Sequence, residues 1–268
     1  FGQTGPWTDR PAYDQIVQGV SGLMSVTGTQ ASGPLRAGYP LADTIGGLTA
    51  AMAITAALNA PQRGCVIDVS MLEAVLATMG WVVSNHLIGG VDPVRSGNEN
   101  PTSAPSGAFQ CADGLVNIAA NKDEQWVLLA RHLGRDDLLA DPLYATREDR
   151  KAHRLRLKAE LETVLTTRTA TEWADALNTI GVPAGPVLSL QDILAHPQMQ
   201  GRDFLSHFED VPGLDQPVDV VRMGAMIDGA RPAVSTPPPS LGQDTDAVLA
   251  DLGYDGAQIA QMREKGVI

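Results

Sequence analysis

Apolar residues recur at helical spacing in two long stretches of the chain. In residues 46–60, leucine, methionine and isoleucine alternate with runs of alanine, which predicts a helix buried on most sides. Residues 71–88 form a second apolar stretch, which we predict as one long helix. Between them, residues 63–70 alternate Val66 and Val69 with other positions and predict a short strand. Helix, strand and helix in this order indicate an α/β layer.

The composition changes where the second apolar stretch ends. Residues 89–105 are rich in Gly, Pro, Asn, Asp and Ser, which is typical of a linker or a functional loop, and we place a domain boundary there. Residues 106–120 then predict a β-hairpin. Its turn contains Asp113 and Gly114, because an Asp-Gly pair supplies the positive φ angles that a tight turn needs.

Helical patterns dominate the region after this hairpin. They cover residues 122–134, 147–166 and 172–180. Thr169 and Glu172 form a Thr-x-x-Glu capping box at the start of the last helix. After His196 the chain becomes irregular, includes a Pro-rich run at residues 236–240, and ends in two short helical stretches.

Composition and charge narrow the class of protein. Hydrophobic residues make up 44% of the 268 residues and charged residues 19%, which is typical of an ordinary globular protein. The net charge of −12 disfavours binding to nucleic acid or to an anionic membrane surface. A single phosphate-bearing cofactor remains possible, because local Arg, Lys and helix N-termini can hold it against the global charge.

Neither a membrane segment nor an export signal is expected. Gly, Asn or Ser interrupts the apolar stretches within about a dozen residues, short of the roughly 20 that cross a bilayer. The chain opens at Phe1 without a basic and then apolar segment, so its start looks cut rather than processed. Cys65 and Cys111 lack companions at zinc spacing, which predicts reduced thiols in a cytoplasmic protein, with neither a disulfide nor a metal.

Several common catalytic motifs are absent from the sequence. It contains no G-x-G-x-x-G after a strand, no Walker loop, no H-E-x-x-H and no G-x-S-x-G. Nicotinamide-dependent redox chemistry, nucleotide hydrolysis and the α/β-hydrolase class therefore lose support. The five histidines are scattered without partners at ligand spacing and are better read as structural residues: His86, His132, His153, His196 and His207.

Asp43 is the acidic residue whose position draws attention, because it lies between a Pro-containing stretch and an apolar helix. Asp is a preferred N-cap residue, and the pattern alone favours that role. Alternatively, the helix end stabilises the Asp43 anion as a nucleophile, while Gly46 and Gly47 leave room for a large substrate. Both interpretations stay open on the pattern alone.

Motifs along the whole chain resemble the class III CoA-transferases, also called the CaiB/BaiF family. The early motifs are FGQTGP at the start, AYDQI at residues 12–16, SGLMSVTG at 21–28, AGYPLADTIGG around Asp43 and RGCVIDVSMLEAV at 63–75. The later ones are GNENPTSAP with SGAFQCADG, NKDEQW at 121–126, GVPAGPVLSLQDILAHPQ from Gly181 and PPPSLGQDTDAVLADLGY from Pro237. Any one of them alone would be weak, but they occur in the order of the family.

The resemblance implies an α/β fold with three parts along this chain. Residues 1–90 would be the remainder of a Rossmann-like large domain that lacks its N-terminal part, and residues 91–205 a smaller α+β domain that interrupts it. Residues 206–268 would return to the large domain. Members of the family form interlaced homodimers.

The resemblance also implies the chemistry. Asp43 matches the nucleophilic aspartate of the family, which moves CoA from an acyl-CoA to a free carboxylic acid through an aspartyl anhydride and an aspartyl-CoA thioester. Backbone N–H groups near Gly46 and Gly47 would stabilise the oxyanions, and residues 98–107 would exclude water in place of a glycine-rich loop. The candidate residues for binding CoA or substrate are Gln3, Tyr13, Asp14, Gly46, Gly47 and Gly107.

Two other functions compete with CoA transfer. The α-methylacyl-CoA racemases share the fold but use a histidine where this chain has Tyr13, so a base for proton exchange is missing and the transferase is favoured. A non-catalytic fragment that binds acyl-CoA or forms dimers is the third possibility. The donor and acceptor acids stay open, although Arg36 and Arg95 could engage an acidic substrate.

Overall fold

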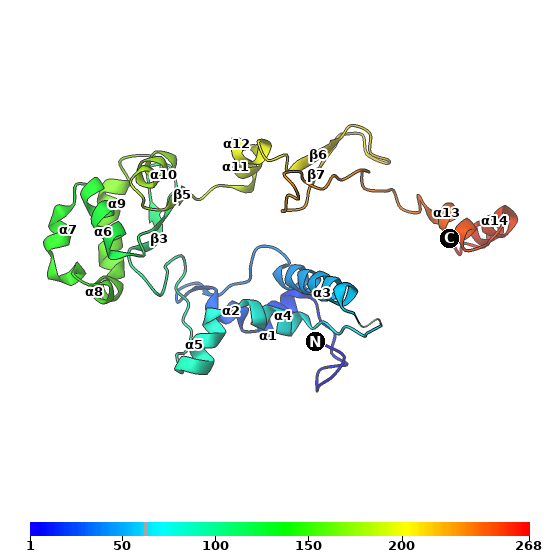
Figure 1. Ribbon diagram of the computed structural model, residues 1–268, viewed down its shortest axis with the longest axis horizontal. Helices are drawn as coiled ribbons and strands as arrows, with labels where there is room; N and C mark the ends of the chain where they lie inside the picture. Colours follow the sequence, from blue (N-terminus) through cyan, green and yellow to red (C-terminus); the bar gives the residue numbers. More distant parts are fainter. Residues whose placement is uncertain (62–63) are drawn as a thin grey trace. The chain divides into compact units, whose positions relative to one another are not determined.

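The computed structural model describes residues 1–61 and 64–268 (Figure 1). The chain divides into two compact units, Phe1–Val187 and Leu188–Ile268, which are described separately. Every strand pairing among the described residues is antiparallel. The structure contains both helices and strands and is mixed α/β in content. The Rossmann-like arrangement and the three-part division remain predictions.

The first unit begins with five helices and a two-stranded ribbon. They are α1 Asp14–Val20, α2 Leu23–Val26, β1 Gly28–Thr29, β2 Gly33–Pro34, α3 Leu41–Asn59, α4 Met71–Thr78 and α5 Trp81–Gly89. Val17 of α1, Ala42 of α3 and Val75 of α4 form a small buried cluster. A Cβ at Gly46 would lie 3.0 Å from Cγ of Met71, so the absence of a side chain at Gly46 lets α3 approach α4.

Helix α3 starts earlier and is more exposed than its pattern predicted. It begins at Leu41, and its buried residues are Ala42 and Gly46, so the prediction of a helix buried on most sides is wrong for this chain. Leu48 and Met52 are 67% and 68% exposed. This helix has 19 residues, and an 18-residue window of it has a mean hydropathy of 1.5. It is long and apolar enough to cross a bilayer, which contradicts the expected interruption of the apolar stretches. Length and composition alone do not separate a membrane span from the core helix of a soluble protein.

The segments around α4 also depart from the prediction. Residues 64–70 form no strand, because no backbone among the described residues pairs with them as a sheet neighbour; Val66 is 98% exposed. The first residues of the predicted strand, 62 and 63, lie outside the described residues. The single helix predicted for residues 71–88 is two helices, α4 and α5, bent by 79° at the break. Gly80 takes φ 52° and ψ −115° there, a conformation that favours glycine.

The remainder of the first unit is a three-stranded sheet packed on helices (Figure 1). The strands, in sheet order, are β3 Ser106–Gln110, β4 Leu115–Ala119 and β5 Ala184–Pro186. The helices are α6 Asp123–His132, α7 Asp136–Ala140, the 3-10 turn η1 Pro142–Tyr144, α8 Arg147–Ala152, α9 Arg154–Leu165 and α10 Ala170–Thr179. Phe109, Val116 and Ile118 of the sheet pack against Leu129 and Leu161 of the helices in the main hydrophobic core.

Local sequence signals in this region are confirmed. The predicted hairpin pairs Ser106 with Ala119 and Gln110 with Leu115, but the positive φ angles predicted for Asp113 and Gly114 in its turn are wrong, since neither residue has one. The Thr169–Glu172 capping box is present, because the Glu172 N–H donates to Thr169 Oγ1 at 3.3 Å and the Thr169 N–H to Glu172 Oε2 at 2.9 Å. The helix predicted over residues 147–166 is divided at His153 into α8 and α9.

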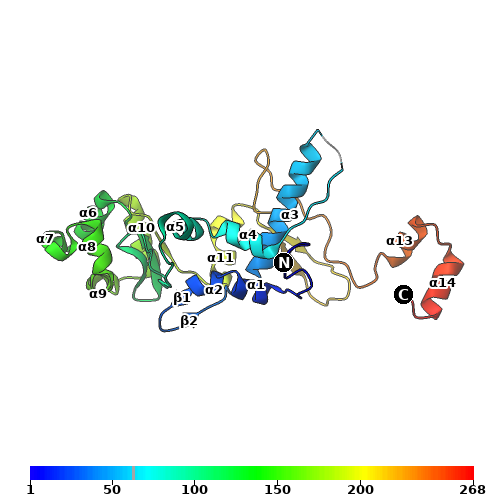
Figure 2. The same cartoon turned by 90° about the horizontal axis from the view of Figure 1, so that it is seen from below.

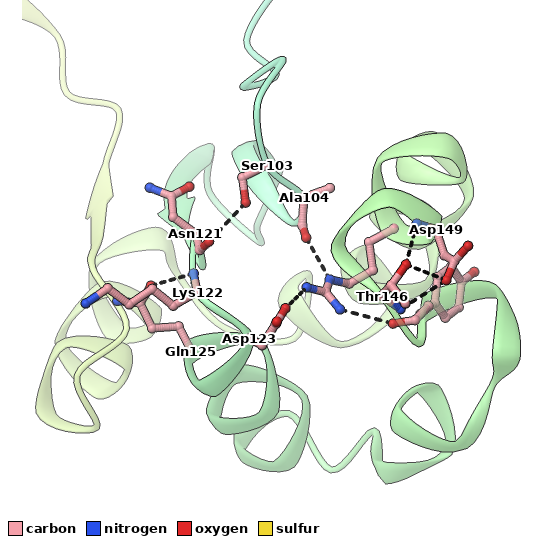
Figure 3. A network of polar contacts seen from close by, with 10 residues as sticks. Ser103, Ala104, Asn121, Lys122, Asp123, Gln125, Thr146 and Asp149 are labelled. Carbon is pink, nitrogen blue, oxygen red and sulfur yellow. Dashed lines mark hydrogen bonds and ion pairs between the residues drawn. The ribbon is translucent and has the colours of Figure 1, made fainter.

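A buried arginine ties the elements of this region together. The Arg150 side chain is 2% exposed and forms an ion pair with Asp123. Its Nε donates to the Ala104 carbonyl at 2.9 Å and its Nη1 to the Tyr144 carbonyl at 3.2 Å. Its guanidinium also lies over the Trp126 ring, 5.6 Å from the centroid. Figure 3 shows this network joining the loop before β3 to α6, η1 and α8.

The second unit, Leu188–Ile268, contains short elements joined by long loops (Figure 2). They are α11 Leu190–Ala195, α12 Pro197–Gln200, β6 Leu205–Phe208, β7 Val218–Val221, α13 Thr245–Asp251 and α14 Gly256–Glu264. Strands β6 and β7 form an antiparallel hairpin, which the prediction of an irregular chain after His196 missed. The two short C-terminal helices are confirmed as α13 and α14.

Candidate functional site around Asp14 and Asp43

The N-terminus of α3 is capped from another helix. Pro40 precedes the first helical residue, Leu41, and makes no side-chain cap. Instead, Asp14 of α1 accepts a hydrogen bond from the Ala42 N–H to its Oδ1 at 2.8 Å. The Asp14 carboxylate thus satisfies one of the N–H groups that a helix start leaves unpaired. The interpretation of Asp43 as the N-cap is therefore wrong, and Asp14 has that role.

Asp43 is the third residue of α3 and its side chain is exposed. Among the described residues, its carboxylate has neither a hydrogen-bond partner nor an ion-pair partner. The partial positive charge of the helix N-terminus stabilises an anion at this position. The Asp43 carboxylate is therefore accessible to solvent and unpaired among the described residues, whereas the Asp14 carboxylate is buried and accepts a hydrogen bond on each oxygen.

Gln18 of α1 holds the loop that leads into α3. Its side chain is fully buried, and its Nε2 donates to Asp14 Oδ2 at 2.7 Å and to the Tyr39 carbonyl at 3.2 Å. Its Oε1 accepts from the Ala37 N–H at 2.9 Å. Gln18 was not among the predicted site residues, although its spacing of four residues from Asp14 places both side chains on one face of α1.

The two glycines predicted beside the nucleophile have different surroundings. Gly46 is buried against Met71 of α4, whereas a Cβ at Gly47 would meet nothing within 4 Å. Both lie in the second turn of α3, where backbone N–H groups are used in the i→i−4 bonds of the helix. The first-turn N–H of Asp43 has no acceptor among the described residues, so it is a better oxyanion donor than the N–H groups of Gly46 and Gly47.

The remaining predicted residues lie in three further places. Tyr13 directly precedes α1 and is 79% exposed. The Gln3 N–H donates to Asp68 Oδ2 at 2.8 Å, which holds the N-terminal loop against the segment that precedes α4. Gly107 lies in β3 and, with residues 97–100, lines a cavity of about 500 Å³. A Cβ at Gly107 would come within 2.8 Å of the Asn98 carbonyl oxygen, so the loop before β3 packs directly on this glycine.

The two arginines considered for an acidic substrate also differ. Arg36 precedes the loop held by Gln18; it is exposed and uses its Nε in a bond to the Ala37 carbonyl at 3.1 Å. Arg95 is engaged by three acceptors in residues 25–30. Arg36 therefore has free donors near the start of α3.

The described part of the chain contains neither a metal-binding cluster nor an activated thiol. Within residues 1–61 and 64–268, no group of three or more His, Cys, Asp or Glu side chains could hold a metal ion. Cys65 is exposed and Cys111 buried, and both are free thiols. Burial raises the pKa of the Cys111 thiol to about 11, which keeps it protonated and unreactive near neutral pH.

Comparison with known proteins identifies the family. The sequence model of the family described as CoA-transferase family III matches residues 1–245. The chain belongs to this family. The resemblance seen in the LADTIGG segment and the other motifs is thereby confirmed.

Curated relatives within CoA-transferase family III cover the chain well. Succinate–glutarate CoA-transferase from Agrobacterium fabrum is 35% identical over 94% of this chain and 63% of its own length. Human succinyl-CoA:glutarate CoA-transferase is 29% identical over 100% of this chain and 62% of its own length. Acetyl-CoA:oxalate CoA-transferase from Acetobacter aceti is 37% identical over 76% of this chain and 54% of its own. The chain thus spans about three fifths of the length of the curated relatives it matches.

Solved structures support the same family and fold. A CaiB/BaiF family protein from Brucella suis superposes with a TM-score of 0.81 at 31% identity, covering 94% of this chain and 66% of that protein. The protein Rv3272 from Mycobacterium tuberculosis gives a TM-score of 0.77 at 27% identity, covering 92% of this chain and 66% of that protein. The mixed α/β fold of this family is therefore confirmed, and the homodimer remains a prediction.

Proposed function

We propose that this chain carries the nucleophile of a CoA-transferase and that Asp43 is that nucleophile. The observation that carries the proposal is the contrast between two carboxylates at one helix end. Both oxygens of Asp14 are engaged, by Ala42 and Gln18, while Asp43 is exposed and unpaired among the described residues. A nucleophile has to be free to reach its substrate, and Asp43 meets that condition.

The reaction proceeds through four acyl transfers. A carboxylate oxygen of Asp43 attacks the thioester carbonyl of the donor, the C–S bond breaks, and CoA thiolate leaves a mixed anhydride. The thiolate attacks the aspartyl carbonyl of the anhydride, which releases the donor acid and forms an aspartyl-CoA thioester. The acceptor carboxylate attacks this thioester and displaces the thiolate, giving a second anhydride. The thiolate then attacks the acceptor carbonyl, which releases the new acyl-CoA and restores Asp43.

The chain's own residues supply orientation and electrostatic stabilisation for these steps. Each step passes through a tetrahedral oxyanion, and the unpaired N–H of Asp43 and the positive end of α3 favour negative charge there. Asp14 and Gln18 fix this helix end and the loop before it. Because each anhydride or thioester is exchanged for another, the thioester energy is conserved and no ATP is required.

We infer that the acids exchanged are dicarboxylic. The names of the relatives support this class for the acceptor, since they include glutarate and oxalate; their donors are succinyl-CoA and, in one case, acetyl-CoA. Arg36 is a candidate for the second carboxylate, because its guanidinium has free donors beside the loop that enters α3. We further propose a cytoplasmic homodimer, as the resemblance to the family implies; sedimentation equilibrium of the purified chain tests the dimer.

The racemase alternative gains no support from the site. A two-base proton exchange needs a second base, and Tyr13 offers a phenol in place of an imidazole. Asp14, the neighbouring acid, is already committed to Ala42 and Gln18.

The Asp43→Asn variant tests the nucleophile. With a succinyl-CoA donor and labelled glutarate, we expect transfer to fall by at least about a thousandfold, because an amide does not form the anhydride. Asp9→Asn is the matched control, since Asp9 is another exposed aspartate near the N-terminus. Hydroxylamine treatment of the wild-type chain during turnover should convert Asp43 to a hydroxamate that mass spectrometry detects.

Two results would contradict the proposal. Equal turnover of Asp43→Asn and Asp9→Asn would remove Asp43 as the nucleophile. A wild-type chain that binds CoA thioesters but never exchanges label would favour the non-catalytic binding fragment instead.

A further inference from the structure

A cavity with an excess of positive charge lies at the junction of α8 and α9. Its volume is about 690 Å³, and it is formed by residues 94–101 and 151–156. Its charged or titratable lining residues are Arg95, Glu99, Lys151, His153, Arg154 and Arg156. Residues 147–158 contain six of the 19 Lys and Arg residues of a chain whose net charge is −12. This concentration of cations sets the cavity apart from the rest of the molecule.

Arg95 enters the cavity as an uncompensated cation. Its Nε donates to the Thr29 carbonyl at 3.2 Å and its Nη1 to the Ser25 carbonyl at 3.1 Å. Its Nη2 lies 3.4 Å from the Gln30 side-chain oxygen. These acceptors are neutral, so they fix the guanidinium without cancelling its charge.

Arg154 and Arg156 add two more positive charges. Arg154 donates from Nη1 to the Asn100 carbonyl at 2.8 Å and from Nε to the Lys151 carbonyl at 3.2 Å, which are again neutral acceptors. Arg156 is exposed and has no hydrogen-bond or ion-pair partner in the part of the chain that the structure describes. The three arginines line the cavity, and none of them pairs with a carboxylate among the described residues.

The acidic residues nearby are already paired. Glu99, which lines the cavity, forms an ion pair with Lys158 at 3.0 Å. Glu148 pairs with Lys151 at 2.8 Å, outside the lining. Neither carboxylate pairs with the arginines of the cavity, so their positive charge favours binding of an anion from solution.

The start of α9 supplies further donors to the same cavity. This helix is 12 residues long, has no acidic residue in its first turn and lacks a side-chain cap at His153. Among the described residues, the N–H groups of Arg154, Leu155 and Arg156 have no backbone acceptor outside the helix. The Nδ1 atom of His153 is buried and has no partner. A helix N-terminus with free N–H groups binds phosphate-like anions.

We propose that this cavity binds a phosphate group. Three arginines that line one cavity together with the start of a helix suit a phosphate dianion better than a planar monoanion. The phosphate could belong to a CoA molecule or be free in solution, and both present the same chemistry to the cavity. The proposal does not depend on the reaction at Asp43, because the two sites share no residue.

Binding to the purified full chain tests the proposal. Inorganic phosphate is titrated while the backbone amide NMR signals of Leu155 and Arg156 are followed, and saturable shifts of these signals are expected. Arg156→Glu should weaken the affinity at least about tenfold, because it removes a charged donor and adds a negative charge. Arg147→Glu is the matched control, since Arg147 is also exposed, lies in the first turn of α8 and does not line the cavity.

The source of the phosphate is separated by two further titrations. If CoA binds at the same amides more tightly than dephospho-CoA, the cavity is assigned to the 3′-phosphate of CoA. If CoA and dephospho-CoA bind no more tightly than inorganic phosphate, it is assigned to a free ion. The proposal is overturned if none of the three ligands gives saturable shifts at Leu155 and Arg156. It is equally overturned if Arg156→Glu and Arg147→Glu bind phosphate alike.

Discussion

Asp14 and Asp43 show how two carboxylates at one helix end acquire different roles. Asp14 points inward from α1 and gives both oxygens to donors, so its function is to hold α3 in place. Asp43 lies in the first turn of α3 itself and remains free among the described residues. The contacts of each carboxylate, and not its residue type, separate the structural acid from the proposed nucleophile.

At the residue scale, the first prediction concerns Gln18. Gln18→Leu removes the donor to Asp14 and the acceptor for the Ala37 N–H, which leaves buried polar groups unpaired. We expect a loss of about 2–4 kcal/mol in the free energy of unfolding. Urea denaturation followed by circular dichroism measures it. Gln15→Leu, an exposed neighbour on α1, should change stability little; equal losses would show that the bonds of Gln18 are not responsible.

A second prediction at this scale concerns Arg36. If it binds the second carboxylate of the substrate acid, Arg36→Ala should raise the KM for glutarate about tenfold or more, because a charge-assisted hydrogen bond is lost. The kcat should change little, since Arg36 does not touch the reacting carbonyl. Steady-state kinetics with varied glutarate separates the two constants. An unchanged KM would remove Arg36 from the substrate site.

At the scale of elements, two adjacent glycines of α3 should respond in opposite directions. Gly46→Val would force its side chain against Met71 and should destabilise the chain by about 1–3 kcal/mol. Gly47→Ala meets open space and should stabilise the helix by up to about 1 kcal/mol, because alanine has the higher helix propensity. Thermal or urea unfolding of both variants compares them. Similar effects would mean that the contact with α4 is not what requires Gly46.

The β6–β7 hairpin should be sensitive to pH. A hydrogen bond to Asp219, with a smaller contribution from Glu209, raises the pKa of His207 above its ordinary value of about 6.5. The stabilisation is therefore fully present below about pH 6.5 and is lost as the pH rises through the higher folded value. NMR titration of the His207 ring should give this raised pKa, and Asp219→Asn should lower it. An unchanged pKa in that variant would contradict the assignment.

The elements that the sequence predicted well are those specified by neighbouring residues. The hairpin of residues 106–119 and the Thr169–Glu172 capping box involve groups within a few positions of each other. The strand at residues 64–70 failed because a strand depends on a distant pairing partner. The cap of α3 was misassigned for the same reason: Ala42 receives its acceptor from Asp14, 28 positions earlier. The prediction that Asp43 is the nucleophile came from the motif resemblance, since its pattern alone favoured a cap.

At the scale of the molecule, a prediction concerns Arg150, the buried cation that lies against the main hydrophobic core. Arg150→Met keeps the volume but leaves the carbonyls of Ala104 and Tyr144 without their donor. We expect a loss of about 2–4 kcal/mol in the free energy of unfolding. Arg147→Met, an exposed change in the same helix, should stay within about 0.5 kcal/mol and serves as the control. Equal losses would show that the network in Figure 3 contributes little.

The exposed apolar surface of the first unit also belongs to this scale. Leu48, Met52 and Leu58 of α3 are 63–68% exposed, and Ile88 of α5 is 87% exposed. Exposed apolar side chains of this size are candidates for contact with other protein or with lipid.

The bond between Asp14 and Gln18 has a consequence for how this site can evolve. A change at Gln18 leaves Asp14 Oδ2 without its donor, and a change at Asp14 removes one of the two acceptors of Gln18 Nε2, so the two positions are expected to be epistatic. Selection should remove single substitutions at Asp14 or Gln18 and retain paired substitutions that restore a donor and an acceptor. Descendants of this sequence should therefore inherit the two residues as a unit, while Tyr13, exposed beside them, is free to drift and to change which molecules the site accepts.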